Sequence, residues 1–218
     1  MENQYEISAK IIKDYLSDKL KLELWQIVGV LCLVFVFAGL FGWLYEFIFY
    51  YFNSGMTTWY MRGSNFIPWI NIYATGSIMI IFLTYKFRKK PWLVFLIAVV
   101  STGILEYCTG LVMDKIFNLR CWDYNTEILS FGSIGGYVCL RSVLIFGLCG
   151  LMLMYLILPI FIKLSQVMNK KVFLTISIVL FSIFLFDELY NLLFARWFGL
   201  PRATDIYSDL GLKYMKYR

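Results

Sequence analysis

A few acidic and basic side chains stand within or beside long apolar stretches of this chain, where they could do chemistry. Glu46 and Glu106 have apolar residues on both sides, and Glu188 follows an aspartate within another apolar stretch. Arg62 and Arg141 stand next to other apolar stretches. A carboxylate can act as a general acid or base, and an arginine can bind a phosphate or carboxylate through two parallel hydrogen bonds. These five residues are therefore the first candidates for a binding or catalytic site.

A polar and aromatic run, "NLRCWDYNTEI" at residues 118–128, raises a second question. Its triplet Trp122-Asp123-Tyr124 could cover a polar site as a lid. Trp and Tyr are also common anchors at a membrane surface, and Asp is a common turn former. The residues alone leave both interpretations open.

Several kinds of site are not expected. The chain has no His, which rules out histidine as a metal ligand or a general base. Its five Cys have no CxxC spacing, so we expect neither a metal site nor a cofactor. Cys121 and Cys139 are near enough in sequence to form a disulfide, and this stays open. The net charge of +6 comes from Lys and Arg clusters beside apolar stretches, which indicates membrane topology signals and no nucleic-acid partner.

Composition predicts the class of protein that holds these residues. The chain has 218 residues, of which 61% are hydrophobic, against about 45–50% in soluble domains. Stretches of about 20 apolar residues are long enough to cross a bilayer. The sequence predicts an all-α, polytopic membrane helix bundle with about five spans, at 25–52, 66–87, 92–114, 138–164 and 172–196.

The two ends of the chain are more polar. Residues 1–24 carry isoleucines, leucines and a tyrosine at helical spacing with lysines off that stripe, which predicts an amphipathic surface helix. Residues 197–218 form a polar tail. The predicted domains are therefore the helix 1–24, the transmembrane domain 25–196 and the tail 197–218.

Basic residues predict the orientation of the spans. Lysines concentrate in the N-terminal segment and near residues 86–90 and 163–171, so the positive-inside rule places the N-terminus in the cytoplasm of a cell membrane. The loops 53–65 and 115–137 then face outward. Five spans also place the basic tail outside, which conflicts with the same rule, and a sixth, re-entrant or surface-lying segment there stays open.

With this orientation, most acidic residues and arginines of the spans, together with two asparagines, lie in or just before the outer half of a span, and the cytoplasmic halves carry almost nothing ionisable. The residues in or before the outer halves are Glu46, Arg62, Asn71, Glu106, Arg141, Asp187, Glu188 and Asn191. Ionisable groups inside a membrane are costly and usually mark sites or pathways. We therefore predict one shared polar site near the outer surface, with separate structural ion pairs as the alternative.

The motifs resemble those of a bacterial membrane-protein family. The elements "GWLYEFIFY" (42–50), "RGSNFIPWINIYATG" (62–76), "LEYCTG" (105–110), "CWDYN" (121–125) and "GGYVCLRSVLIFGLCG" (135–150) are similar in order and spacing to those of the type IV ABC-transporter permeases, also called CmpB-like. The resemblance covers roughly residues 30–160. It points to Glu46, Arg62, Gly63, Pro68, Tyr73, Glu106, Trp122, Asp123, Tyr124, Gly136 and Cys139.

The chain departs from the family pattern at a few positions. Ile67 stands where the family has Gly, Asn71 replaces a Pro, and Tyr137 stands where the family has Arg. Arg141 comes four residues later, and we expect it to restore the charge from one helical turn along the same face. The predicted substrate-binding residues are Glu46, Arg62, Tyr73, Glu106, Trp122, Asp123, Tyr124, Arg141 and Glu188.

The resemblance implies a permease that binds a small polar or charged solute in an outer cavity. The chain has no GxxxxGK[ST] loop of its own, so a separate ATPase subunit would hydrolyse ATP, or a homo-oligomer would complete the path. Two alternatives stay open. One is a membrane-embedded enzyme acting on a lipid head group, and the other is a small membrane binding or immunity protein.

Overall fold

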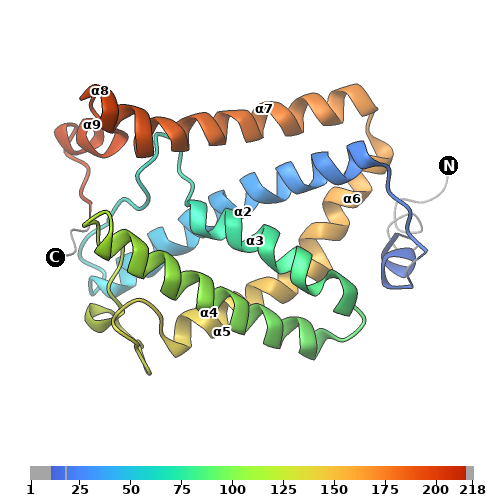
Figure 1. The fold of residues 1–218 in the computed structure, drawn as a ribbon, viewed down its shortest axis with the longest axis horizontal. Coiled ribbons are helices and arrows are strands. Elements are labelled where there is room, and N and C mark those ends of the chain that lie inside the picture. Colours follow the sequence, from blue (N-terminus) through green and yellow to red (C-terminus); the bar gives the residue numbers. More distant parts are fainter. Residues whose placement is uncertain (1–10, 18, 215–218) are drawn as a thin grey trace.

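The chain folds into helices that run lengthwise between two ends of the molecule (Figure 1). The structure, a computed structural model, describes residues 11–17 and 19–214. Its helices are α2 (Leu24–Asn53), α3 (Asn71–Thr84), α4 (Pro91–Lys115), α5 (Leu140–Met152), α6 (Leu158–Val167), α7 (Lys170–Leu189), α8 (Ala195–Phe198) and α9 (Ala203–Asp209). π-Helical turns at Leu153–Ile157 and Tyr190–Phe194 join α5 to α6 and α7 to α8.

Among the residues that the structure describes, four helical stretches are long and apolar enough to cross a membrane: Leu24–Asn53, Pro91–Lys115, Leu140–Val167 and Lys170–Phe198. The predicted all-α membrane bundle is therefore confirmed. The predicted second span, 66–87, differs from the others because its helix α3 begins only at Asn71 and ends at Thr84. A short 3-10 turn, Tyr85–Phe87, follows it.

Proline and asparagine explain several helix boundaries. Pro91 occupies the first turn of α4, where its missing N–H costs no hydrogen bond. The Asn169 side chain accepts a hydrogen bond from the Lys171 N–H at 2.9 Å and so caps α7. Pro159 is the second residue after the first π-helical turn. A proline inside a helix cannot bond to the carbonyl four residues back, and a widened turn before it accommodates this loss.

Helix α2 is central, since it packs against α3, α6 and α7, while α4 packs against α3 and α5. Glycines let aromatic rings approach α2 closely. A Cβ added at Gly29 would lie 2.4 Å from the Phe173 ring, and one at Gly39 would lie 2.6 Å from the Phe184 ring. These close approaches join α2 to α7.

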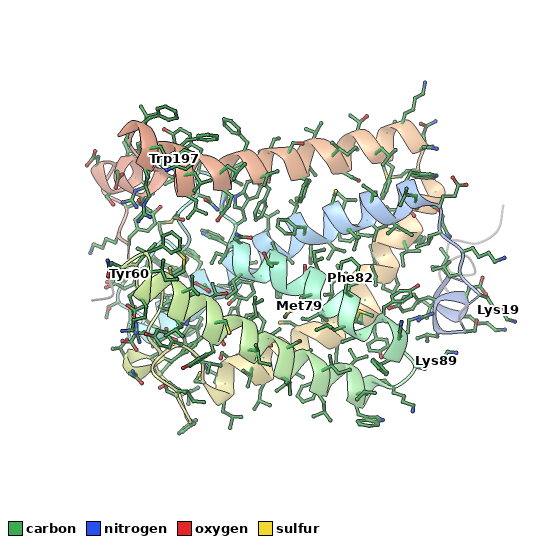
Figure 2. All side chains as sticks on the ribbon, in the orientation of Figure 1. Lys19, Tyr60, Met79, Phe82, Lys89 and Trp197 are labelled. Carbon is green, nitrogen blue, oxygen red and sulfur yellow. The ribbon has the colours of Figure 1, made fainter. Side chains whose placement is uncertain are left out.

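Different connecting segments lie at the two ends of the bundle (Figure 1). The N-terminal end holds residues 11–17 and 19–23 and the connections α3–α4 and α6–α7. The loop end holds residues 54–70, 116–139 and 199–214. In Figure 2, Lys19 and Lys89 lie at the N-terminal end, whereas Tyr60 and Trp197 lie at the loop end.

The apolar core fills mainly the half near the N-terminal end. Its buried residues include Val34, Val94, Met154, Ile162 and Phe173. Of the predicted N-terminal helix, residues 1–10 lie outside the described residues and 11–16 are helical. Ile11 and Tyr15 are buried in the same core cluster, which places this short helix against the bundle.

Arg88 fixes this N-terminal segment to the bundle. Its Nε donates to the Tyr15 carbonyl oxygen at 2.8 Å, and its guanidinium lies 4.1 Å from the centre of the Tyr85 ring. The Tyr155 hydroxyl in turn donates to the Arg88 carbonyl at 2.7 Å. The segment before α2 is therefore tied to both the α3–α4 connection and the π-helical turn before α6.

The tail folds back on the loop end. The Tyr207 hydroxyl in α9 donates to the Phe66 carbonyl at 2.8 Å, and the Met61 N–H donates to the Lys213 carbonyl at 2.8 Å. Within the described residues the tail makes no further crossing. It packs instead on the segment that leads from α2 to α3.

Candidate functional site

A small cavity lies at the loop end between α2, α3, α4, α5 and the loop 116–139, and we call it the loop-end cavity. Its volume is about 30 Å³. By this measure one water molecule needs about 10–15 Å³, so the cavity has room for about two waters. Its lining residues are Tyr45, Glu46, Phe49, Tyr50, Ile72, Tyr73, Glu106, Trp122, Tyr124, Glu127, Arg141, Ser142, Ile145 and Phe146.

Glu46 in α2 forms the first ion pair of this region. The Arg62 Nε lies 2.7 Å from Glu46 Oε2, and both side chains are largely buried. The Arg62 guanidinium also lies 3.9 Å from the centre of the Tyr50 ring. The Trp43 indole N–H donates to the Arg62 carbonyl at 3.0 Å. Arg62 is thus held against α2 by its backbone and its side chain.

The second ion pair joins the loop to α5. Arg141 NH2 lies 2.7 Å from Glu127 Oε2, and the Glu127 side chain is only 1% exposed. The Tyr50 hydroxyl donates to the other oxygen of this carboxylate. The Arg141 guanidinium also lies 4.0 Å from the centre of the Phe49 ring. Glu127 therefore connects the loop to both α2 and α5.

Arg141 has hydrogen-bonding capacity to spare. Its Nε and NH1 atoms are buried and have no hydrogen-bond partner among the described residues. A buried donor without an acceptor costs about 1–3 kcal/mol. Because Arg141 lines the cavity, a bound molecule with an acceptor oxygen would remove this cost.

Glu106 in α4 is bound by hydroxyl groups. The Tyr124 hydroxyl donates to one oxygen, and the Ser142 hydroxyl donates to the other at 2.7 Å. Glu106 is 4% exposed, and it makes no ion pair among the described residues, unlike Glu46 and Glu127. The three carboxyl groups of the cavity thus have two different environments.

Of the triplet Trp122-Asp123-Tyr124, the two aromatic residues line the cavity and the aspartate does not. The Trp122 indole donates to the Tyr137 carbonyl at 2.8 Å. The Asp123 carboxylate accepts from the Asn125 N–H at 3.0 Å and pairs with Arg120 at 3.1 Å. Asp123 is therefore a turn former that holds the two aromatic residues in place.

Gly136 allows this turn to close. Its φ is +77°, and a Cβ there would lie 2.2 Å from the Arg120 guanidinium and 2.3 Å from the Asp123 carboxylate. Its carbonyl accepts a hydrogen bond from the Tyr124 N–H at 3.0 Å. The positive φ and the lack of room for a Cβ are both met without strain only by glycine.

Tyr73 forms the inner wall of the cavity. A Cβ added at Gly42 of α2 would lie 2.2 Å from the Tyr73 ring, so this glycine provides the space for the ring. The ring also packs on Phe146 of α5, with 5.1 Å between ring centres. Tyr73 therefore closes the gap between α2 and α5 from the side of α3.

Glu188 belongs to a different cluster. It accepts hydrogen bonds from Asn65 at 2.7 Å and from Asn71 at 3.2 Å. Its neighbour Asp187 accepts the backbone N–H groups of Phe66 and Ile67, each at 2.9 Å. These contacts fix the non-helical segment 62–70 on α7, so the structure does not bring Glu188 to the cavity.

That segment reaches deep into the bundle. The Ile70 N–H donates to the Gly39 carbonyl near the middle of α2 at 3.0 Å, and Trp69 is 3% exposed. Non-helical backbone is tolerated at membrane depth only where protein groups satisfy it. The Asp187 carboxylate and the Gly39 carbonyl do so here, which explains why α3 begins late.

The structure brings six predicted site residues to the wall of one cavity, and Arg62 reaches it through Glu46. The six are Glu46, Tyr73, Glu106, Trp122, Tyr124 and Arg141. Sequence reasoning missed Glu127, Tyr50 and Ser142. Glu127 closes the polar run at 118–128, and the need of Arg141 for a counter-charge is the signal that could have identified it.

The proposed helical relation between Tyr137 and Arg141 is wrong. Helix α5 begins at Leu140, and Tyr137 lies in the turn before it. The Tyr137 hydroxyl donates to Asp114 at 2.5 Å, at the end of α4. Arg141 therefore reaches the cavity from the first turn of α5, by a route independent of Tyr137.

Burial changes the acidity of loop residues near the cavity. It raises the pKa of Glu127, although the Tyr50 hydroxyl and Arg141 act in the opposite direction. It also raises the pKa of the Cys121 thiol to about 11. Cys121 and Cys139 are both free thiols. No group of three His, Cys, Asp or Glu within 11–17 and 19–214 is arranged to hold a metal ion.

Comparison with known families identifies one match. Residues 33–192 match the model of a family described as "Putative ABC-transporter type IV". The match runs from α2 through α7 and includes the residues of the loop-end cavity. Comparisons with curated proteins and with solved structures give no match. The family that the motifs predict is therefore confirmed.

Proposed function

We propose, because the chain belongs to the type IV ABC-transporter family, that it is the membrane-embedded component of a transporter and binds a small polar or charged solute in the loop-end cavity. The family supports the role in transport. The solute site rests on the geometry of the cavity itself.

One observation carries this proposal above all others. Arg141, whose side chain is 11% exposed, lines the loop-end cavity and has two buried nitrogen atoms, Nε and NH1, without a partner among the described residues. Buried polar groups are nearly always satisfied, and exceptions need an explanation. A solute with acceptor oxygens supplies one.

The charges around the cavity suit selection of a polar solute. Glu46 and Glu127 each pair with an arginine, whereas Glu106 accepts only hydroxyl donors. Each carboxylate oxygen can accept more than one hydrogen bond, so Glu106 can still accept a donor from a solute. The cavity therefore offers donors on one wall and an acceptor on another.

The loop 116–139 would admit the solute. The cavity of about 30 Å³ holds only about two waters, so a larger solute requires the side chains of its wall to move. Trp122, Tyr124 and Glu127 come from this loop, while the other lining residues come from membrane helices. Movement of the loop opens the cavity without separating the helices.

An ATPase subunit is the partner that this role requires. Lysines near the start of α2, in the α3–α4 connection and at the start of α7 support a cytoplasmic N-terminal end by the positive-inside rule. The connections there, near residues 85–90 and 168–169, are short. The N-terminal segment before α2, fixed by Arg88, is the element best placed to receive such a subunit, and a homo-oligomer would complete the path.

Purification from native membranes tests this assignment. We expect the tagged chain to co-purify with a nucleotide-binding ATPase, identified by mass spectrometry. ATPase activity of that complex should fall when Glu106 is changed to Gln in the chain. Recovery of the chain without any ATPase, with hydrolysis of a lipid head group by the purified chain alone, would contradict the transporter role.

Within the part of the chain that the structure describes, two carboxyl groups of the cavity pair with an arginine and one does not. This difference favours a second candidate function, an enzyme acting on a lipid head group. Glu106 has no basic partner among the described residues, whereas Glu127 is paired with Arg141, and a general acid and a general base need different environments. Glu106 would then act as the acid and Glu127 as the base. Product formation by the purified chain is the outcome that would favour this candidate.

A further inference from the structure

A second cavity adjoins the loop-end cavity and has the opposite character. We call it the apolar cavity. It has a volume of about 50 Å³ and lies between α2, α3 and the α5–α6 helix. Its walls include Phe37, Ala38, Ile80, Cys149 and Leu153. Among its lining residues, only Ser77 and Tyr73 carry a hydroxyl group. The Ser77 hydroxyl donates to the Ala74 carbonyl and is therefore already satisfied.

The two cavities share a wall. Tyr73 of α3 and Phe146 of α5 line both of them, and their rings pack on each other with 5.1 Å between centres. One face of this ring pair therefore meets the charged residues of the loop end, and the other meets hydrocarbon. A rotation of two aromatic side chains would join the cavities into one.

The apolar cavity is partly open between α2 and the α5–α6 helix. Three of its lining residues, Phe37 and Phe41 of α2 and Cys149 of α5, are each partly exposed. These residues lie within two stretches that are long enough to span a membrane. The opening therefore faces the hydrocarbon of the bilayer, and a molecule could enter the site sideways from the membrane.

We propose that the ligand of this joint site is a phospholipid-like amphiphile with one chain, whose head group carries both an oxyanion and an ammonium group. The oxyanion accepts from Nε and NH1 of Arg141, and the ammonium meets Glu106. The first carbons of the chain occupy the apolar cavity, whose volume is about 50 Å³, and the rest of the chain leaves it toward the membrane. This inference rests on the proposed solute site and names its substrate class.

Three observations select this class over a free polar solute. The unpartnered Arg141 donors require an acceptor, and Glu106 is the one carboxyl group of the cavity without a basic partner among the described residues. The aromatic lining around it, which includes Tyr45, Tyr73 and Tyr124, also favours an ammonium group through cation–π attraction. The adjoining apolar cavity offers space for the start of an apolar chain next to the head group.

Charge balance supports a head group that is neutral overall. Three carboxyl groups and one guanidinium group, that of Arg141, line the cavity, while Arg62 lies behind Glu46. Each of these two arginines already pairs with a carboxylate. A ligand with an oxyanion alone would face the unpaired Glu106. A ligand that also carries an ammonium group places its positive charge there.

Binding to the detergent-solubilised full chain tests the inference, with native mass spectrometry and thermal unfolding as readouts. The probes are lysophosphatidylethanolamine, glycerophosphoethanolamine, which lacks the chain, and lysophosphatidylglycerol, which lacks the ammonium group. We expect the first probe to bind at least tenfold more tightly than either of the others. Equal binding of all three would overturn the inference.

Two substitutions locate the site. Ala38→Phe fills the apolar cavity and should weaken binding of lysophosphatidylethanolamine at least tenfold. Cys32→Phe, in a separate apolar groove between α2, α3 and α7, is the matched control and should leave binding unchanged. Equal loss in both variants, or no loss in Ala38→Phe, would mean that the lipid binds elsewhere on the helices.

A third variant tests the polar half while keeping the charges balanced. The double substitution Glu127→Gln with Arg141→Met removes one ion pair without leaving a lone charge. It should weaken binding at least tenfold, whereas Arg196→Met on the exposed α8 should not. Unchanged binding in the double variant would overturn the inference, and continued co-purification of an ATPase in that case would leave the transporter role intact.

Discussion

The ion pair between Glu127 and Arg141 is the contact on which the loop-end cavity depends most. It joins a loop to a membrane helix, and the Glu127 side chain is 1% exposed. Removing one partner of a buried ion pair typically costs about 3–5 kcal/mol, because the other charge stays buried without compensation. Removing both partners costs less.

A double-mutant cycle tests this contact. We expect Arg141→Met to lower the free energy of unfolding by about 3–5 kcal/mol, and Glu127→Gln with Arg141→Met to recover at least a third of that loss. Denaturant unfolding in detergent, followed by tryptophan fluorescence, is the measurement. Purely additive losses would show that the pair does not interact.

The same pair predicts a pH dependence. Burial raises the folded-state pKa of Glu127 above its unfolded value, so folding favours its protonated form. The stabilisation from proton uptake is complete below the unfolded pKa and is lost as the pH rises through the folded pKa. In Arg141→Met the loss of stability should therefore be smaller at pH 5 than at pH 8, and a loss independent of pH would contradict this.

Cys121 offers a second test at this scale. Its pKa rises from 9.0 to about 11 through burial, and the thiolate is the reactive form. At pH 8 we expect a chain with Cys121 as its sole cysteine to react with iodoacetamide about 100-fold more slowly than the same chain after denaturation. Equal rates in the two states would show that the thiol is neither buried nor perturbed.

At the scale of elements, Gly42 determines how closely α3 approaches α2. A Cβ at this position would lie 2.2 Å from the Tyr73 ring, the wall between the two cavities. Overpacking a core typically costs about 1–3 kcal/mol. We expect Gly42→Ala to lower stability by about this amount in thermal unfolding.

Gly76 in α3 is the matched control for this prediction. A Cβ there would meet its nearest neighbour, Leu105, at 3.6 Å, which is an ordinary contact. Alanine is also favoured over glycine inside a helix by roughly 0.5–1 kcal/mol. Gly76→Ala should therefore keep or raise the melting temperature, and a loss equal to that of Gly42→Ala would refute the role of the close approach.

Asp187 holds the non-helical segment 62–70 against α7, since its carboxylate accepts hydrogen bonds from two backbone N–H groups of that segment. In Asp187→Asn one acceptor oxygen becomes a donor, which leaves an N–H group without a partner. We expect a loss of about 1–3 kcal/mol and faster proteolysis within residues 54–70. Asp209→Asn, at the exposed end of α9, should change neither, and identical effects in both variants would contradict this role.

At the scale of the whole molecule, sequence patterns predict the membrane bundle well because apolar length is set by bilayer thickness. The sequence also predicts that Glu46, Glu106 and Arg141 lie toward one end of the bundle, because each stands in the part of its helix that is nearer to the loops 54–70 and 116–139. The start of α3 could not be predicted in this way. The apolar run 66–70 resembles a helix, but contacts with Asp187 and Gly39 that are remote in sequence hold it in an irregular form.

The site itself could be predicted only in part for a similar reason. Glu188 and Glu46 both stand near the loop end of their helices, yet Glu188 faces Asn65 and Asn71 while Glu46 faces the cavity. Position along a helix predicts depth in the membrane, whereas the direction of a side chain depends on the rotation of each helix. The loop residue Glu127 needs the folded loop before its partner Arg141 becomes evident.

The central claim is that charged side chains from several membrane helices meet around one cavity that takes a ligand. An electron-microscopy structure of the full chain in lipid nanodiscs, at a resolution that shows side chains, tests it most directly. We predict that Arg62 pairs with Glu46, that Arg141 pairs with Glu127, and that non-protein density contacts Arg141 Nε. Arginines that point away from the bundle toward lipid head groups, with apolar side chains filling the space between Glu106 and Tyr73, would contradict it.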